Sequence, residues 1–350
     1  MFKFKKSIFF LILLIIISIT YTGCSKKQAE PTSVEPISKE GVLLGTICKV
    51  TIYDESSRDV LEKAFKRISE IEDKMSINKD TSELINVNSK SGKEYVKVSS
   101  DTFDVIKKSL YYSELSKGKF DISIGPIVKL WNIGTDQARV PSDAEIKAKL
   151  PLVNYKNILL DEKNEKVMLR EPGMIIDLGA IAKGYAADEV EKVLLENGVK
   201  HALINLGGNI YAMGPKPDNT KWRLGIQDPE STRGEYLGII EVENKSVVTS
   251  GIYERYLEQN GKRYHHILDT HTGYPVSNSL VSVSIIADKS VDADGLSTST
   301  FALGLEEGMK LIESLKNVDA IFVTSDHKVY VSSGLKGKLN ITNSKYILQN

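Results

Sequence analysis

The sequence predicts an α+β fold, a two-lobed mixed α/β unit with antiparallel-rich sheets. Two observations predict it. Expected strands outnumber expected helices, and the two kinds of element do not alternate regularly, which disfavours a doubly wound parallel sheet. Between Gly41 and Asn350 the sequence has no repeat and no linker-like stretch. We therefore expect one domain over residues 41–350.

The first 23 residues have the pattern of a targeting segment. A basic start precedes an apolar run over residues 8–19, which is shorter than the ~20 residues of a spanning helix. Gly23-Cys24 follows and resembles a bacterial lipobox, so we expect a lipoprotein signal peptide over residues 1–23 and an acylated Cys24. An uncleaved N-terminal anchor is the alternative. Residues 24–40 lack apolar periodicity and predict a flexible tether.

Charge and cysteine content narrow the function classes. The 350 residues include 46 basic and 46 acidic side chains and 41% hydrophobic residues, which excludes a polybasic nucleic-acid binder and a disordered polyelectrolyte. We expect no nucleic-acid partner. The two cysteines, Cys24 and Cys48, exclude a disulfide scaffold and a multi-cysteine metal site. Cys48 is expected to be buried in a strand.

The elements follow from periodicity. Residues 42–53 alternate apolar and polar side chains and predict a strand, whereas residues 59–75 and 101–117 have helical spacing. A short element is expected over residues 143–150. A helix is expected over residues 182–197, and others start near Asp292 and Glu306. The remaining strands are expected over residues 158–161, 167–170, 174–177, 202–205, 210–213, 222–227, 236–241, 246–249, 253–257, 264–268, 281–287, 320–324 and 329–332.

One candidate site lies where an expected strand ends and a helix begins. Asp177 ends the strand, Gly179-Ala180 forms a turn, and Lys183 lies in the first helical turn. Free N–H groups, the helix dipole and an ammonium group together suit a phosphate. A tight strand–helix turn with a surface lysine has the same pattern. The sequence has no G-x-G-x-x-G after a strand and no Walker A loop.

A second candidate is a pair of oxygen ligands. Asp294 and Thr298 are four residues apart on an expected helix and share one face. Carboxylate and hydroxyl oxygens are hard ligands that suit Mg²⁺. The alternative is that Asp292 caps the helix and that the Thr298 hydroxyl bonds within its own helix.

Glycines and histidines mark two more segments. Gly207-Gly208 lies between two expected strands, where a ligand can approach closely or a plain hairpin can turn. His265 and His266 are adjacent on an expected strand and point to opposite faces. At most one of them can enter a given site.

The ordered set of these segments resembles the ApbE family, the FAD:protein FMN transferases. The resemblance spans about Leu44 to Ser332. Its most specific parts are Asp177-Leu-Gly-Ala-Ile-Ala-Lys-Gly-Tyr, Asn205-Leu-Gly-Gly-Asn, His266-Ile-Leu-Asp with Thr272-Gly-Tyr-Pro, and Asp294-Gly-Leu-Ser-Thr298.

The resemblance implies roles for individual residues. Asp294, Thr298 and the backbone carbonyl of Ala180 would hold Mg²⁺ beside the pyrophosphate of FAD, the substrate. Lys183 would lie near the phosphates and His266 would accept a proton, so these two are the candidate catalytic residues. The positions expected to contact FAD are Leu44, Gly45, Thr46, Asn78, Asp121, Asp177, Lys183, Gly207, Gly208, Thr249, Ser250, Gly251 and His266.

It also implies a reaction, partners and a location. FMN would pass from FAD to a threonine or serine hydroxyl of an acceptor protein, with release of AMP. The implied acceptors are subunits of Rnf or NADH:quinone oxidoreductase complexes, or exported FMN-binding domains. The protein would be anchored to the cell membrane by its lipid and face the exterior or the periplasm.

Asn78 departs from the family pattern, which often has an aromatic residue there. A polar side chain beside the flavin would admit water, which makes a metal-dependent FAD pyrophosphatase an alternative. A helix cap near residues 82–86 is the structural explanation for Asn78. A non-catalytic flavin-binding lipoprotein is a third possibility, although such a protein has no need of the Asp294/Thr298 pair.

Overall fold

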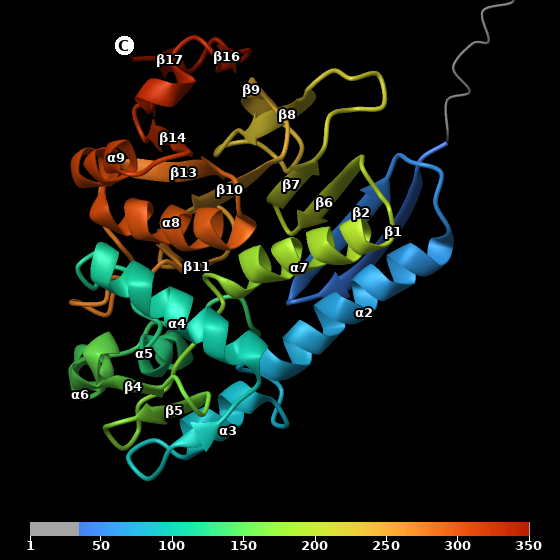
Figure 1. The fold of residues 1–350 in the computed structure, drawn as a ribbon. Helices are drawn as coiled ribbons and strands as arrows, with labels where there is room; N and C mark the ends of the chain where they lie inside the picture. The colour runs from blue at the N-terminus through green and yellow to red at the C-terminus, as the bar shows by residue number, and fades with distance from the viewer. Residues whose placement is uncertain (1–34, 350) are drawn as a thin grey trace, which may run out of the picture. The chain divides into compact units, whose positions relative to one another are not determined.

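A nine-stranded sheet runs through the computed structural model, which describes residues 35–349 (Figure 1). Neighbouring strands are antiparallel, except that β15 and β17 are parallel. Residues from Pro36 onward form one compact unit. In spatial order the strands are β1 (Ile37–Leu43), β2 (Thr46–Ile52), β6 (Ala202–Leu206), β7 (Asn209–Met213), β10 (Lys245–Gly251), β13 (Leu280–Ala287), β14 (Val318–Thr324), β15 (Lys328–Val331) and β17 (Ile347–Leu348).

Helices cover one face of this sheet. Figure 1 shows α2 (Arg58–Met75), α7 (Ala182–Glu196) and α8 (Ser290–Leu303) side by side, followed by α9 (Leu305–Ser314). The amphipathic spacing of α2 places Leu61, Ile68 and Ile71 in the main core with almost no exposure. This layer positions the two helices, α7 and α8, that carry the predicted phosphate and metal residues.

A small sheet packs on the opposite face. It contains β16 (Asn340–Ile341), β9 (Tyr236–Val242) and β8 (Trp222–Gln227), in that order. Trp222 and Ile240 pack with Val247 and Ile321 of the large sheet in a second core. A two-stranded ribbon, β11 (Tyr256–Gln259) and β12 (Lys262–His265), lies between β10 and β13 in the sequence.

The second lobe is built from residues 83–170 and occupies the lower part of Figure 1. Trp131 and Ile146 are fully buried in a separate cluster, and Trp131 Nε1 donates to the Gly273 carbonyl at 2.8 Å. The elements are α3 (Glu83–Ser89), β3 (Val96–Lys97), α4 (Ser100–Leu115), α5 (Gly125–Trp131), α6 (Asp143–Lys149), β4 (Ile158–Asp161) and β5 (Lys166–Leu169), with short 3₁₀ turns at Leu150–Leu152 and Tyr155–Asn157 and a later one at Ser333–Leu335.

These elements confirm the α+β prediction, and the first strand needs a correction. The expected strand over residues 42–53 is a hairpin, because Leu44 and Gly45 turn the chain with φ of 53° and 66°. Its first arm begins at Ile37, so residues 37–40 are strand rather than tether. Cys48 is fully buried in β2, as expected. The predicted leader and Cys24 lie outside the described residues.

Three other expectations differ in detail. The expected strand over residues 174–177 has a single bridge, between Ile175 and Ile124. The expected strands over residues 253–257 and 264–268 are the ribbon β11–β12, which starts three residues later and ends at His265. Helix α5 was not expected, since its start, Gly125-Pro126, has the composition of a loop.

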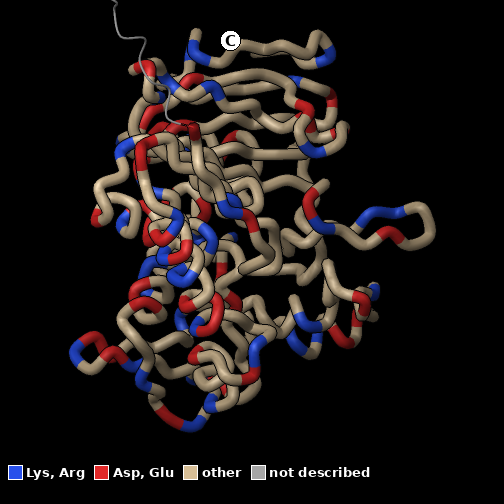
Figure 2. The backbone as a smooth tube through the Cα atoms, turned by 90° about the vertical axis from the view of Figure 1, so that its right-hand side faces the viewer, with Lys and Arg blue, Asp and Glu red and all other residues tan. Residues whose placement is uncertain are grey.

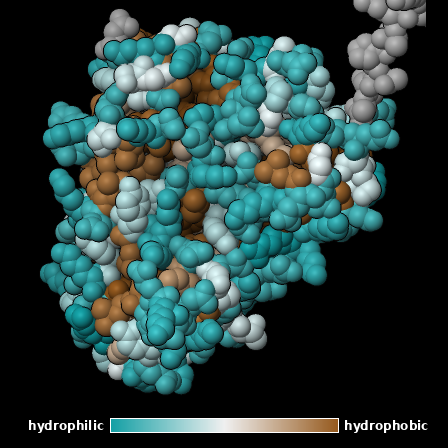
Figure 3. All heavy atoms as spheres, viewed as in Figure 1, coloured by the Kyte–Doolittle hydropathy of each residue, from teal (hydrophilic) through white to brown (hydrophobic). Residues whose placement is uncertain are grey.

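The surface is mixed in charge and mostly hydrophilic. Basic and acidic residues are interspersed along the outer turns and helices (Figure 2). In the view of Figure 3, separate apolar patches lie between hydrophilic side chains. Among residues 35–349, every helix is too short or too polar to cross a bilayer.

Candidate functional site

The start of α7 is capped from another helix. The first N–H groups of a helix have no partner within it. Helix α7 begins at Ala182, and the Gly184 N–H in its first turn donates to Asp294 Oδ2 of α8, at 2.8 Å. Ala180 precedes the helix, and among residues 35–349 its carbonyl accepts no hydrogen bond, so it remains available to a ligand.

Gly184 allows the two helices to come this close. A Cβ on Gly184 would lie 2.3 Å from the Ser290 carbonyl oxygen and 2.7 Å from Asp294 Cβ. Neither neighbour can move cheaply, since one is backbone and the other is packed in a helix. Glycine is therefore required where α7 crosses α8.

The Lys183 ammonium faces the same carboxylate. Its Nζ lies 3.4 Å from Asp294 Oδ1 and 3.5 Å from Oδ2. Charge-assisted hydrogen bonds are usually about 2.7–2.9 Å long, so this contact is loose. Asp294 is only 3% exposed, whereas Lys183 is partly exposed. A buried anion with one loosely held cation can accept a second cation.

The start of α8 is capped from α7 rather than by its own residues. Asp188 accepts from the Ser290 N–H at 2.7 Å and from the Val291 N–H at 2.9 Å. Asp292 points elsewhere and accepts from the Tyr112 hydroxyl at 2.7 Å. The alternative in which Asp292 is the helix cap is therefore wrong.

Thr298 differs from the hydroxyl residues around it. Ser297, Ser299 and Thr300 each donate to a carbonyl of their own helix, at 2.7–2.9 Å. Among the described residues, the hydrogen-bond neighbour of Thr298 Oγ1 is Ser250 Oγ, 3.4 Å away. The Thr298 hydroxyl is thus directed toward the end of β10 and is not used within α8.

The end of β10 contributes a second hydroxyl. Ser250 Oγ also lies 2.8 Å from Ser297 Oγ, which ties β10 to α8. The preceding Thr249 hydroxyl bonds across the sheet to Ser284 at 2.7 Å. Of these two predicted contact residues, Ser250 is the one joined to the Asp294/Thr298 helix, and Gly251 ends the strand beside it.

Two glycine turns meet at neighbouring strand ends. A Cβ on Gly207 would lie 2.3 Å from Thr46 Oγ1, so the β6–β7 and β1–β2 turns are in contact. Gly207 and Gly208 have φ of 65° and 100°, which favours glycine at both. Open space surrounds the Cβ position of Gly208. The predicted residues Thr46, Gly207 and Gly208 are therefore brought together.

The β1–β2 turn is held from two sides. The Leu44 N–H donates to Glu72 Oε1 at 2.8 Å, and the Gly45 carbonyl accepts from Arg255 Nη2 at 3.1 Å. Glu72 also pairs with Lys79 at 2.7 Å, which connects the turn to the segment with Asn78. Asn78 itself is exposed, and Ser82 caps α3, so Asn78 is not the cap of that helix.

His266 follows directly after β12. Its Nδ1 lies 3.1 Å from the Arg255 carbonyl oxygen, which can only accept, so Nδ1 carries the proton and Nε2 keeps its lone pair. The pKa of His266 is lowered to about 4, chiefly by burial and in smaller part by the charges of Arg255 and Lys183. His265, by contrast, is buried against the Val276 carbonyl. His266 is the histidine that can accept a proton.

The two remaining predicted carboxylates have different surroundings. Asp121 is buried, and its oxygens accept from Ser123 and from the Tyr155 N–H, which orders the loop before α5. Asp177 accepts from the Gly179 N–H at 2.8 Å, and burial raises its pKa. The structure thus gives Asp121 a bracing role in its loop, and its predicted contact with FAD stays a prediction.

The donors at this site suit Mg²⁺. Asp294, Thr298 and the Ala180 carbonyl offer oxygen atoms that the fold leaves wholly or partly unused. Mg²⁺ is commonly held by one or two carboxylates together with water and substrate phosphates. Residues 35–349 hold no cluster of three His, Cys, Asp or Glu side chains arranged for a metal. The donor set therefore fits an ion shared with a phosphate substrate better than an all-protein cage.

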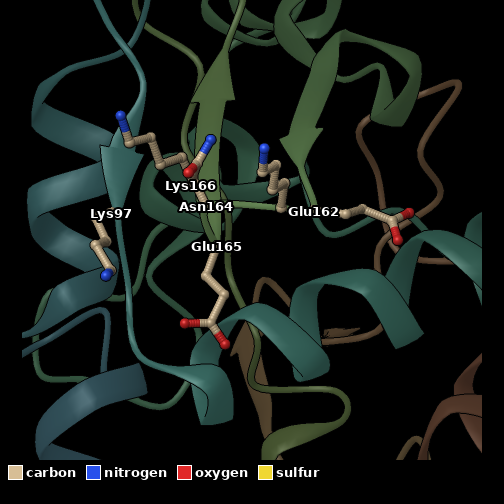
Figure 4. Close-up of a pocket in the computed structure, with 6 residues that line it drawn as sticks. Lys97, Glu162, Asn164, Glu165 and Lys166 are labelled. Carbon is tan, nitrogen blue, oxygen red and sulfur yellow. The ribbon is translucent and has the colours of Figure 1, made fainter.

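Two surface pockets lie at other residues. One of about 360 Å³ is lined by mostly charged side chains of the β4–β5 hairpin, including Glu165, and by Lys97 of β3 (Figure 4). Another of about 570 Å³ is lined by residues of the β8–β9 loop and of the ribbon, including Arg233 and Tyr256. Neither contains a predicted site residue.

Local sequence gave little sign of four residues that hold the site together. They are Glu72, Gly184, Asp188 and Arg255. A glycine in the first turn of an otherwise good helix was the one signal available, because glycine weakens a helix unless something packs closely against it. Each of the other three also bonds to a partner more than 25 residues away in the sequence, which local patterns do not show.

Known proteins match the chain over most of its length. The family model of the ApbE family matches residues 44–322. A FAD:protein FMN transferase of Klebsiella pneumoniae (strain 342) is 38% identical, over 88% of this chain and 96% of that protein. One from Treponema pallidum (strain Nichols) is 35% identical, over 90% and 92%.

Solved structures show the same fold. The ApbE protein of Thermotoga maritima superposes with a TM-score of 0.80 and 32% identity, over 87% of this chain and 99% of that one. The flavin transferase ApbE of Vibrio cholerae gives 0.78 and 28%, with the same coverage. The Asp177–Tyr185 and Asp294–Thr298 segments lie inside the matched region. The chain therefore belongs to the ApbE family.

Proposed function

We propose that this protein transfers FMN from FAD to a threonine or serine hydroxyl of an acceptor protein and releases AMP. The observation that carries the proposal is the joint between α7 and α8. There a buried carboxylate, an ammonium group and an unused backbone carbonyl lie at one helix N-terminus. The names of the Klebsiella and Treponema relatives support it.

The reaction is a phosphoryl transfer. The acceptor oxygen attacks the phosphorus on the riboflavin side of the pyrophosphate. A bond from the acceptor oxygen to this phosphorus forms as the bond from the phosphorus to the bridging oxygen breaks, and AMP leaves with the bridging oxygen. The hydroxyl proton must go to a base. Such transition states are loose, so positioning and charge neutralisation matter more than a strong base.

Asp294, Thr298 and the Ala180 carbonyl would hold Mg²⁺, which when bound neutralises charge on the pyrophosphate. The Lys183 ammonium, now 3.4 Å from Asp294, would turn to the phosphate oxygens. The N-terminus of α7 adds its own partial positive charge.

His266 would accept the hydroxyl proton at Nε2. Its pKa of about 4 makes it a weak base that is neutral at physiological pH. A weak base is sufficient because the hydroxyl proton is lost late in a loose transition state. The Arg255 carbonyl accepts a hydrogen bond from Nδ1–H, which keeps the lone pair on Nε2.

The finer points are also part of this proposal. The protein would be a lipoprotein, anchored through acylated Cys24 and facing the exterior or the periplasm. Its acceptors would be subunits of Rnf or NADH:quinone oxidoreductase complexes, or exported FMN-binding domains. The sequence 1–24 and the family resemblance support these points.

A direct experiment separates transfer from hydrolysis. The chain without residues 1–24 is incubated with FAD, Mg²⁺ and an exported FMN-binding domain, and the acceptor mass is measured. A gain of one FMN, lost with EDTA and restored by Mg²⁺, is the expected result. Release of FMN and AMP with no gain in acceptor mass would identify an FAD pyrophosphatase. The exposed Asn78, linked through Lys79 and Glu72 to the β1–β2 turn, makes that the second candidate.

A further inference from the structure

Arg255 joins parts of the site that are far apart in the sequence. It lies in the segment between β10 and β11, and its Nη2 donates to the Gly45 carbonyl at 3.1 Å. A Cβ on Gly134 would lie 3.3 Å from Arg255 Cδ. The side chain thus spans from the turn after α5 to the β1–β2 turn.

The backbone of the same residue sets the geometry of His266. The Arg255 carbonyl lies 3.1 Å from the His266 N atom and 3.1 Å from its Nδ1. The first contact fixes the start of the segment after β12, and the second fixes the ring and its tautomer. One residue therefore controls both the turn and the proton acceptor.

The guanidinium charge also acts on the site. It lowers the pKa of the Asp177 carboxyl, which burial raises, and it lowers the pKa of His266. The charged and titratable groups that face His266 are Arg255, His265 and Lys183. A guanidinium has five N–H donors. One donates to Gly45 among the described residues, which leaves others for an anionic substrate.

We propose that Arg255 is a positioning residue for the transfer: its guanidinium holds the β1–β2 turn in place beside FAD, and its carbonyl holds His266 ready to accept a proton. The proposal rests on the proposed function. It adds a residue that links the β1–β2 turn to the proposed proton acceptor.

Side-chain variants isolate the contribution of the guanidinium, because the backbone carbonyl is kept in all of them. Arg255→Met keeps the stem against Gly134 and removes the donor and the charge, whereas Arg255→Lys keeps the charge. We expect Arg255→Met to raise the KM for FAD about two- to fivefold, the range for an exposed charged contact. The acidic limb of its pH profile should move to higher pH. Arg255→Lys should return the acidic limb to its wild-type pH and should lower the KM part of the way to the wild-type value.

Arg263→Met is the matched control. Arg263 is also exposed, lies in β12 and stacks on Tyr256, with 4.1 Å from its Cζ to the ring centre. Its loss removes the same charge without touching the turn or His266. We expect KM and pH profile as in the wild type.

Two results would overturn the proposal. One is an Arg255→Met enzyme with the KM and acidic limb of the Arg263→Met control. The other is an equal loss in Arg255→Met and Arg255→Lys, with a lower melting temperature and an unmoved limb, which would show a role in the fold alone. If the wild type transfers no FMN, the proposed function fails. FAD affinities of the same variants, measured by flavin fluorescence, then still decide whether Arg255 holds the turn.

Discussion

The Gly184 N–H donates to Asp294 Oδ2 at 2.8 Å, across 110 residues of sequence. This hydrogen bond connects the first turn of α7 to the middle of α8. It places the only carboxylate we assign to the metal directly at a helix N-terminus. The same carboxylate therefore has a structural and a chemical task, and two substitutions can separate them.

Asp294→Asn should keep the fold and lose the reaction. An amide oxygen can still accept from Gly184, whereas Asp294→Ala leaves that buried N–H unpaired and should cost about 1–3 kcal/mol of unfolding free energy. Both substitutions remove the negative charge that we assign to Mg²⁺ binding, so transfer should fall about 100-fold or more. Urea unfolding and acceptor mass measure the two effects. An Asp294→Asn enzyme with wild-type turnover would falsify the metal assignment.

Gly184→Ala should push the two helices apart. The new Cβ would meet the Ser290 carbonyl at 2.3 Å, and overpacking of this kind costs about 1–3 kcal/mol. Transfer should fall together with stability, since Lys183 and Asp294 move with their helices. Glu196→Ala, exposed near the end of α7, is the control and should change stability by less than about 0.5 kcal/mol. Equal stabilities of the two variants would contradict the close crossing.

The transfer rate should fall only at a low pH, below the ordinary pKa of histidine. The active form of His266 is the neutral ring, and its pKa is lowered to about 4. The ring therefore stays neutral from alkaline pH down to about pH 5 and becomes protonated below that. We expect the transfer rate to show a half-drop near pH 4, absent in His266→Asn. A half-drop near the ordinary histidine pKa of about 6.5 would contradict the burial of the ring.

Asn78→Tyr should change the fate of FAD without weakening the fold. Asn78 is exposed, and α3 keeps its Ser82 cap. A ring at this position would exclude water from the phosphorus. We expect slow FAD hydrolysis in the wild type and less of it in the variant, with FMN transfer retained. The ratio of AMP released to FMN attached, at saturating acceptor, is the measurement, and an unchanged ratio would refute the idea.

Cys24→Ala tests the anchor. Loss of the proposed acylation site should shift the protein from the membrane fraction to the soluble exported fraction, or leave an uncut leader. Fractionation and the mass of the N-terminal peptide report both outcomes. Cys48→Ala is the control, because that thiol is buried in β2 and should have no effect on location. A wild-type protein that still carries residues 1–23 would point to the uncleaved anchor.

Short-range spacing predicted where three candidate site residues lie on their helices. Lys183 lies in the first turn of a helix, and Asp294 and Thr298 lie on one helix face, because both relationships depend on spacings of a few residues. The structure adds what spacing cannot show. The alternative in which the Thr298 hydroxyl bonds within its own helix is wrong, since this hydroxyl faces Ser250.

Long-range partners and turns were harder to predict. The pair Leu44-Gly45 is not one of the usual hairpin pairs such as Asn-Gly or Asp-Gly, and the positive φ angles of both residues identify the turn. The first arm of that hairpin is an edge strand with half of its side chains in solvent, which in sequence resembles a tether. Arg255 gave no signal, because an exposed arginine is ordinary and its partner is 210 residues away.

The span from Gly184 to Asp294 also has a consequence for the order of folding. Contacts between residues this far apart in the sequence form late, after the segments between them have been brought together. Before the contact forms, the start of α7 is unpaired and the site for a pyrophosphate is incomplete. FAD and metal therefore cannot template the early chain. They can act only on the finished fold, where binding to the native state adds stability by mass action and slows its loss.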